Sequence, residues 1–468
     1  MIKYNKKTRR NSQSGSILIY NVIIIFIFTL VMLGVLSYST FQLRVTRGSI
    51  NSELAFQIAE AGANYYQWHL AHFSTDYKDG TNAPGPYVHD YTDTDTNILV
   101  GRFSLVVIPP SPGSTVVTIQ STGYSLANPN QKKVVTTRYG VPSLAQYAFL
   151  TNSDAWIGST ESISGQFHTN GGVRFDGSGN APIFSSKSTY TCISTFGCSP
   201  SVTKPGIWGA ATSSTQAYWQ YPVPNVDFSS MTSDLATIKT NAQSGGIYLP
   251  ASNAQGYSLV FKINGSVDVY KVTSLVSGEP TGYDVNGQAR NTSLDYNARS
   301  FQFNQNIPTN GLIYVEDKVW VEGTVRGRAM VAAAKLPYNT NTAPNILISN
   351  NLLYSAKDGT DSLGLISQQD ILVTFKSPNS LEIDAAMIAQ NGSIERLNYP
   401  GDIKNNITIY GTVASYGVWT WSWVNGSGNT TSGYVNTNTI YDSNLLYSPP
   451  PSFPLSSSGY QQITWTSN

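Results

Sequence analysis

The sequence predicts a mainly β protein with one long N-terminal α-helix, a small antiparallel sheet and a parallel β-solenoid-like C-terminal region. Fifteen of the twenty residues 17–36 are Ile, Leu, Val or Phe. Only 12% of the residues are charged, whereas Gly numbers 39 and Tyr 29, a composition typical of β-rich extracellular proteins. From residue 311 onward, short alternating apolar segments recur. A chain of 468 residues has room for two or three such domains.

The apolar segment predicts a transmembrane helix over residues 16–40. No charged residue occurs between Arg10 and Arg44, and about twenty apolar residues span a bilayer. Basic residues without an acid precede the segment: Lys3, Lys6, Lys7, Arg9 and Arg10. We therefore expect a single-pass membrane protein with a cytoplasmic N-terminus and an ectodomain beyond the membrane, at the cell surface or in a pilus.

The helix is expected to continue to residue 72 without a loop. Apolar residues recur at intervals of three and four and predict one stripe of an amphipathic helix: Ile50, Leu54, Ile58, Ala61, Tyr65 and Trp68. We therefore expect one continuous helix over residues 16–72, with an N-terminal half that faces lipid and a C-terminal half that faces partners.

The leader, the apolar run and the segment Glu53-Leu-Ala-Phe-Gln-Ile-Ala-Glu-Ala-Gly62 resemble type IV pilin-like proteins, especially PilX-type minor pilins. The resemblance implies that a prepilin peptidase removes a leader of residues 1–15 by cutting between Gly15 and Ser16. It also implies that other pilin-like subunits are partners and that the box is a helix assembly motif, comprising Ala59, Glu60, Ala61 and Gly62.

One position departs from the family pattern. Major pilins carry a glutamate at the fifth mature position, which here is Tyr20. The departure favours a minor subunit at the tip or in priming over a repeating subunit of a pilus, pseudopilus or secretion filament. The alternative is a plain signal anchor whose Ala-Glu-Ala-Gly box is merely good helix-forming sequence; an ordinary secretory signal would place its small residues after the apolar core.

Residues 73–142 predict a small pilin-like β domain. Turn residues fill 71–91, and strand-like runs follow at 102–108, 115–120 and 133–138. We expect these runs to form antiparallel hairpins against the C-terminal half of the helix.

Residues 143–454 predict a solenoid-like extracellular domain, because short strands separated by Gly and Asn bury a continuous column only when stacked. An insertion is expected at about 185–300, with hairpins around 257–263 and 267–272 and a short helix at 231–240. The segments 363–366, 383–392 and 449–451 resemble an uncharacterised domain of bacterial pilin-like surface proteins, which implies no activity. The tail, 455–468, is expected to be loosely ordered or to add one strand through Ile463 and Trp465.

Several side chains are candidates for a site. Cys192 and Cys198 are expected to form a disulfide outside the cytoplasm. The alternating Trp419, Trp421 and Trp423 either form an exposed platform for a sugar or adhesive contact, or are buried; burial is the favoured alternative.

Ion binding has one candidate loop. Carboxylates alternate at Asp93, Asp95 and Asn97, as in calcium loops, although Ile98 replaces the expected glycine. An ordinary polar loop is the favoured alternative, and no other cofactor is expected. His69 and His72 lack a third metal ligand nearby in the sequence.

No hydrolase elbow, phosphate loop or zinc-protease motif occurs, so we expect no enzyme. The competing class is a membrane-anchored β-helix enzyme acting on carbohydrate, with Asp370, Glu382 and Asp384 as its carboxylates. Basic and acidic residues number 28 and 27, a balance that does not favour nucleic acid as a partner. A surface polysaccharide or a ligand on a host or partner cell fits an adhesive ectodomain.

Overall fold

The computed structural model describes residues 14–228, 235–290, 292–425, 428–456 and 459–467. The chain divides into two compact units. Unit 1 takes in Met1–Ile108, Thr118–Arg138 and Gln462–Asn468, and unit 2 takes in Pro109–Val117 and Tyr139–Gln461. The protein is mainly β with one long N-terminal helix, as the sequence predicts.

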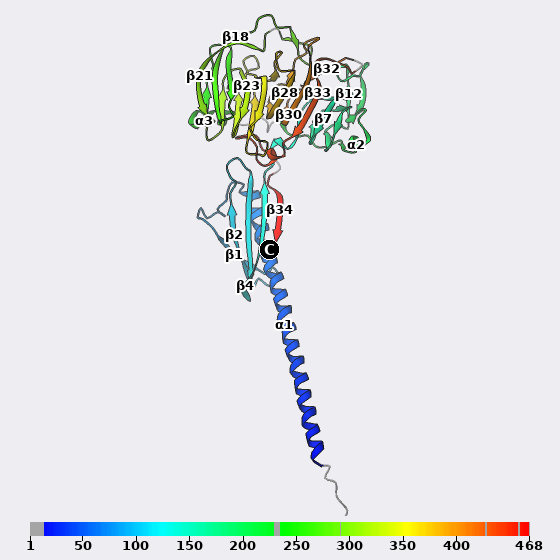
Figure 1. The fold of residues 1–468 in the computed structure, drawn as a ribbon, viewed down its shortest axis with the longest axis vertical. Helices are drawn as coiled ribbons and strands as arrows, with labels where there is room; N and C mark the ends of the chain where they lie inside the picture. The colour runs from blue at the N-terminus through cyan, green and yellow to red at the C-terminus, as the bar shows by residue number, and fades with distance from the viewer. Residues whose placement is uncertain (1–13, 229–234, 291, 426–427, 457–458, 468) are drawn as a thin grey trace, which may run out of the picture. The chain divides into compact units, whose positions relative to one another are not determined.

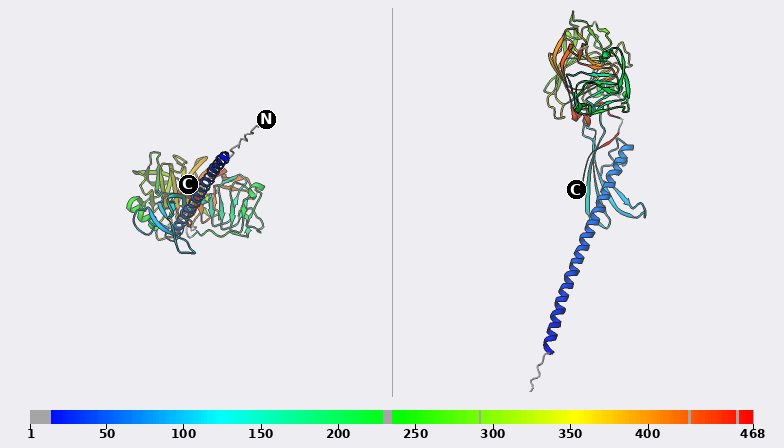
Figure 2. Two further views of the ribbon diagram at one scale, coloured as in Figure 1. Left: turned by 90° about the horizontal axis from the view of Figure 1, so that it is seen from below. Right: turned by 90° about the vertical axis from the view of Figure 1, so that its right-hand side faces the viewer.

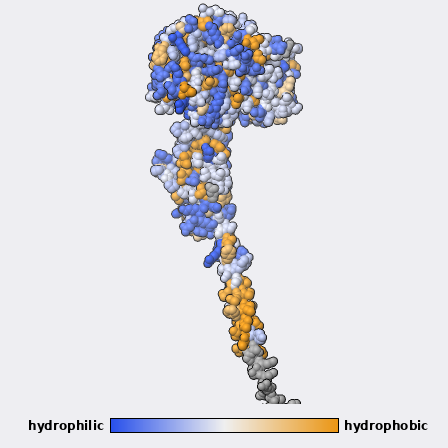
Figure 3. Space-filling view, in the orientation of Figure 1, coloured by the Kyte–Doolittle hydropathy of each residue, from blue (hydrophilic) through white to orange (hydrophobic). Residues whose placement is uncertain are grey.

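The long helix α1 spans Ser14–His72 without a break, a length of about 90 Å at 1.5 Å per residue. Its most apolar 18-residue window has a mean hydropathy of 2.7, and none of that window is buried. The helix is long and apolar enough to cross a membrane. Figure 2 shows the sheet of unit 1 beside only the C-terminal half of α1, and Figure 3 shows the apolar half in orange.

The sheet of unit 1 has five strands in the order β1-β2-β3-β4-β34. Four strands are consecutive in the chain: β1 Tyr87–Thr92, β2 Leu99–Ile108, β3 Val116–Ser125 and β4 Asn128–Gly140. The fifth, β34 (Gln461–Ser467), comes from the C-terminal tail. The Thr137 hydroxyl donates to the Thr464 carbonyl at 3.0 Å, and Trp465 packs edge-on against Phe56 of α1. The tail therefore supplies the strand expected around Ile463 and Trp465.

Unit 2 is a parallel β-solenoid-like stack with three columns of strands (Figure 1). The first column runs in spatial order through β15 Trp219–Gln220, β11 Ile183–Ser185, β8 Phe167–Thr169, β5 Phe149–Thr151, β30 Ile403–Ser415, β28 Ser380–Ala389, β26 Ser362–Ser367, β24 Arg328–Ala333, β22 Leu312–Val315 and β16 Ile247–Leu249. The second column runs through β17 Gly256–Phe261, β23 Val319–Val325, β25 Ile346–Tyr354, β27 Ile371–Val373, β29 Ile394–Arg396 and β31 Trp419–Thr420.

The third column is formed by the later parts of β23 and β25, the earlier parts of β28 and β30, and then β33 Thr430–Tyr441, β7 Glu161–Ser164 and β10 Ser178–Gly179. Inward-facing residues of successive rungs stack into a single core that includes Ile383, Ile409 and Ile163. No single rung has enough residues to bury these side chains, so the stack is stable only as a whole.

The order of rungs in space differs from their order in the chain. β15 and β16 are neighbours along the chain but lie at opposite ends of the first column. The connection between them includes α3 (Leu235–Gly245), and β33 returns to pair with β7. Residues 185–300, expected to be an insertion, thus contain strands of both ends of the stack.

The expected hairpins in this stretch exist as β17 and β18 (Ser266–Leu275), which pair antiparallel. β18 also pairs with β21 (Tyr296–Asn306). The helix expected at 231–240 is α3, and residues 231–234 lie outside the described residues.

Candidate functional site

The Ala-Glu-Ala-Gly box lies where α1 crosses its own sheet. Ala59 is fully buried, and a Cβ on Gly62 would lie 2.3 Å from the Ser121 Oγ. From the sheet side, a Cβ on Gly123 would lie 2.3 Å from the Ala59 backbone nitrogen. Helix and sheet approach this closely only because both positions lack a side chain. We call this contact the glycine seam: Ala55, Ala59 and Gly62 on α1, with Gly123 on β3.

The glycine seam corrects the predicted orientation of the helix. Ile50 and Trp68, expected on the buried stripe, are 59% and 55% exposed. Ile58 of the expected stripe is fully buried, and the buried face of α1 also includes Ala55, Ala59, Tyr66 and Leu70. Glu60 and Ala61 of the box are half-buried. The box thus packs α1 against its own sheet, and the two ends of the expected stripe, Ile50 and Trp68, stay exposed.

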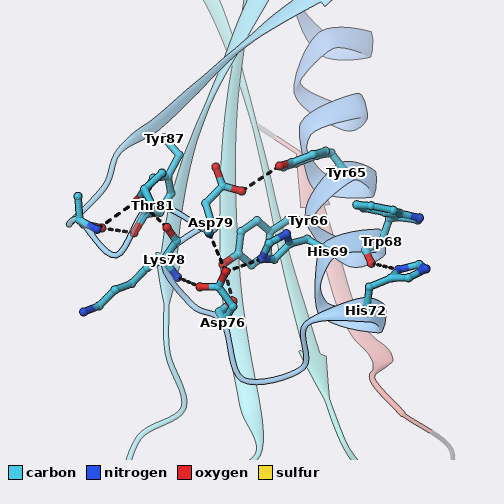
Figure 4. Close-up of polar contacts among 12 residues, drawn as sticks. Tyr65, Tyr66, Trp68, His69, His72, Asp76, Lys78, Asp79, Thr81 and Tyr87 are labelled. Carbon is cyan, nitrogen blue, oxygen red and sulfur yellow. Dashed lines mark hydrogen bonds and ion pairs between the residues drawn. The ribbon is translucent and has the colours of Figure 1, made fainter.

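A polar network attaches the loop after α1 to the helix end (Figure 4). His69 Nε2 lies 3.0 Å from the Asp76 Oδ2. The Tyr65 hydroxyl donates to the Asp79 Oδ1 at 3.1 Å, and Asp79 also pairs with His89 Nε2 at 2.7 Å. The backbone amides of Lys78 and Gly80, followed by His69, lower the pKa of Asp76.

Two histidines of this network, His69 and His89, are each bonded to one aspartate. His72 points away from His69, with its Nδ1 2.8 Å from the Trp68 carbonyl (Figure 4). Among the described residues, no group of three or more His, Cys, Asp or Glu side chains is arranged to hold a metal ion.

In the predicted calcium loop, the first carboxylate, that of Asp93, accepts hydrogen bonds from the loop itself. Asp93 Oδ1 accepts hydrogen bonds from the amides of Asp95 and Thr96 at 3.0 and 2.8 Å and from the Thr96 hydroxyl at 2.9 Å. These bonds lower the pKa of the Asp93 carboxyl. Asn97 adopts a left-handed conformation with φ 54°. The geometry is that of a turn closed by its own aspartate.

The two cysteines are bonded to each other, with an S–S distance of 2.07 Å. The disulfide joins β12 (Thr189–Cys192) to the segment before β13 (Val202–Pro205), and these two strands form a hairpin. Arg174 stacks over the Trp156 ring at 4.3 Å and donates to the Phe196 carbonyl inside the disulfide loop. The disulfide shapes this loop on the outer face of the stack.

The three tryptophans do not form an exposed row. Trp419 and Trp421 are 7% and 2% exposed and belong to the solenoid core. Trp419 stacks on Phe149 with a centroid distance of 4.1 Å. Trp423 is half-buried and donates its indole N–H to the Arg396 carbonyl. Burial makes the alternative of an exposed platform for ligand stacking wrong.

The three carboxylates considered for catalysis lie in different environments. Glu382 and Asp384 both pair with Lys357 Nζ, at 2.7 and 2.8 Å. Asp370 instead faces Arg290, at 3.7 Å, and lies near Glu395. Burial, reinforced by the charge of Asp370, raises the pKa of Glu395 to about 8. The sequence around Glu395 does not show that its carboxyl is buried. Its strand has only three residues, too few for the alternation of apolar and polar side chains to reveal which side faces the interior.

The predicted cleavage site lies at the start of the described chain. Residues 1–13 of the leader, with its five basic residues, lie outside the described residues. Gly15 and Ser16 fall in the first turn of α1.

Fold and site together define a class of protein: an apolar N-terminal helix, packed in its C-terminal half by an antiparallel sheet, and a separate parallel solenoid-like unit. Neither a protein-family model nor a curated protein matches the chain. Among solved structures, the chain is similar to the competence-associated pilin ComZ from Thermus thermophilus. The TM-score is 0.34 at 12% identity, and the match covers 89% of this chain and 97% of that chain.

Proposed function

We propose that this protein is a minor type IV pilin-like surface protein, assembled through α1 into a pilus, pseudopilus or secretion filament. The division of α1 carries the proposal. Its N-terminal half exposes an unbroken apolar surface to any neighbour, while its C-terminal half is fastened to a sheet through the glycine seam. A helix of this design passes from lipid into a bundle of like helices without rearranging the domain that it carries.

Tyr20 supports a minor role for the subunit. An acidic side chain in the membrane would need a partner, and Tyr20 requires none. The mature subunit therefore has no carboxylate at the position where major pilins engage the amine of a neighbour. A place at the tip or in priming, where few subunits are needed, follows from this difference.

The ectodomain is proposed to be structural or adhesive rather than enzymatic. Glu382 and Asp384 are held by one lysine, and Asp370 lies in a separate cluster. This arrangement does not provide the paired, accessible acid and base that glycoside hydrolysis requires. Membrane lipid, a prepilin peptidase and other pilin-like subunits are the partners of α1, with the N-terminus in the cytoplasm.

Processing by a prepilin peptidase tests the proposal. On co-expression with such an enzyme, the chain should lose residues 1–15 and begin at Ser16, as intact mass and the N-terminal peptide would show. Gly15→Val should block the cut. Gly48→Val is the control and should be cut normally, because this glycine of the same helix has nothing within 4 Å of the position that a Cβ would take. An uncut wild-type chain, or cutting of Gly15→Val at the same rate, would refute the assignment.

A further inference from the structure

A hollow of about 360 Å³ lies on the outer face of the solenoid-like unit, where β17, β23 and β25 run side by side. Polar and apolar surface contribute about equally to its lining, which comprises Val260, Glu322, Gly323, Thr324, Asn350, Asn351 and Leu353. Glu322 is buried, whereas Asn350 is exposed. Amide and carboxylate groups therefore converge on a small concave surface.

Residues of β21 hold the acidic wall of the hollow in place. The Glu322 Oε1 accepts hydrogen bonds from Arg299 Nη1 at 2.8 Å and from the Tyr296 hydroxyl at 3.2 Å. The Arg299 guanidinium lies between two rings, 4.4 Å from the Tyr270 centroid and 4.9 Å from the Tyr296 centroid. A second bond joins Arg299 to the Ser258 hydroxyl. The wall is thus preorganised, and a ligand would not have to order it.

A ladder of polar side chains continues from the hollow along the stack. The Asn351 Oδ1 accepts the Glu382 amide at 2.9 Å. On the strands that follow, the outward-facing residues paired in register, one from each strand, are Glu382, Thr408, Asn438, Ser162 and Ser178. Rungs are about 4.8 Å apart, so these groups repeat at a spacing close to the length of one pyranose ring. β23, β28, β30 and β33 face the viewer in Figure 1, and the same view in Figure 3 is predominantly hydrophilic there.

The charged side chains at the hollow and at the start of the ladder are paired with one another. Arg299 pairs with Glu322, and Lys357 pairs with Glu382 and Asp384 while covering the Tyr410 ring at 4.5 Å. An anionic polymer would need cations that are free to meet it. Side chains that offer amides and hydroxyls at a regular spacing suit a ligand that is rich in hydroxyls, uncharged and itself periodic.

We propose that the hollow and the ladder form a binding site for a linear neutral polysaccharide, one sugar entering the hollow and the rest lying along the stack. The site rests on the proposed adhesive function and names the chemistry of its ligand. Asn350 and Asn351 would bind hydroxyls of the first sugar, and the outward residues of β28, β30 and β33 would bind those of the sugars that follow.

Sedimentation with insoluble polysaccharides tests the site, using the full chain in detergent. Cellulose and chitin serve as neutral probes and calcium alginate gel as a charged one. We expect saturable binding to at least one neutral polymer. Thr324→Phe, which fills the hollow, should lower the affinity by at least about tenfold. Thr203→Phe on β13, an exposed threonine of another hairpin, should bind as the wild type does.

A second variant separates the ladder from the hollow. Asn438 is exposed, so Asn438→Phe is expected to fold normally, to weaken binding of the polymer and to leave binding of a disaccharide unchanged. The site is refuted if neither neutral polymer binds, if alginate binds better than both, or if both variants bind like the wild type. Cutting at Gly15 without polymer binding would overturn this site alone, whereas polymer binding by a chain that is never cut would overturn the pilin-like assignment alone.

Discussion

Substitution of Gly123 by alanine should loosen α1 from its sheet. The new Cβ would lie 2.3 Å from both the Ala55 carbonyl oxygen and the Ala59 amide nitrogen. Both contacts are with backbone, so no side-chain rotation relieves them. Overpacking of this kind costs about 1–3 kcal/mol, and the reduced freedom of the unfolded chain returns about 0.4–1 kcal/mol. Because neither contact can be relieved, the cost lies in the upper half of that range, and the net loss of stability in unit 1 is about 1–2.6 kcal/mol.

Hydrogen exchange followed by mass spectrometry measures this loss locally in the detergent-solubilised full chain. A loss of that size corresponds to exchange that is faster by about five- to eightyfold in peptides covering residues 55–66 and 118–125. Gly48→Ala is the matched control, because nothing lies within 4 Å of the position of its added Cβ and alanine favours a helix. Exchange in Gly123→Ala as slow as in the wild type would refute close backbone packing at the glycine seam.

Three further predictions concern unit 2. Because the folded pKa of Glu395 is raised to about 8, the folded state holds a proton that the unfolded state releases above about pH 4.3. The free energy of unfolding should therefore fall as pH rises from about 5 to 8, by up to about 1.4 kcal/mol per pH unit. In Glu395→Gln, the melting temperature should depend less steeply on pH over the same range. Equal dependence in the variant and the wild type would contradict a buried, protonated carboxyl. Ile383→Ala, at a fully buried rung position, should cost about 2–5 kcal/mol by denaturant unfolding, and a cost below about 1 kcal/mol would mean that the rung is not packed as described. Replacing both Cys192 and Cys198 by serine should lower the stability of their loop by about 2 kcal/mol, the loop-closure entropy expected for so short a loop. Hydrogen exchange should become faster only around residues 189–205. Unfolding of the whole unit would show that the disulfide does more than shape its loop.

The sequence is sufficient to predict those elements whose signals are local. The apolar run of α1, the hairpins of the small sheet and the recurring rungs after residue 311 each follow from periodicity within one segment. The fold class is predicted correctly for this reason. The same holds for the hairpin of β17 and β18, whose strands are adjacent in the chain.

The features that the sequence does not predict are contacts between residues that are far apart in the chain. The pairing of β33 with β7 and the crossover from β15 to β16 decide which residues form the ends of the stack, and no local pattern records them. The rotation of α1 is a second case, since Ile50 and Trp68 of the predicted stripe stay exposed whereas Ala55, Ala59 and Gly62 lie against the sheet. Glycines at positions 62 and 123 allow that packing, and their complementarity is visible only once both elements are placed.

The candidate site is the least predictable feature. The hollow is lined by Glu322 and Asn351 from different rungs, and Glu322 is held by Arg299 and Tyr296 of β21. These residues belong to separate strands, and no local pattern shows that they meet. Trp419 and Trp421, by contrast, lie in the core, as the favoured alternative of burial predicted.

The identity of the N-terminal residue in sheared filaments tests the central claim most directly. Filaments would be sheared from cells that produce the protein and separated from membranes, and the N-terminal peptide would be determined in both fractions by mass spectrometry. We predict a chain that begins at Ser16 in the filament fraction, in low abundance relative to the major subunit. An intact leader confined to the membrane fraction would contradict the pilin-like assignment and leave an anchored surface protein.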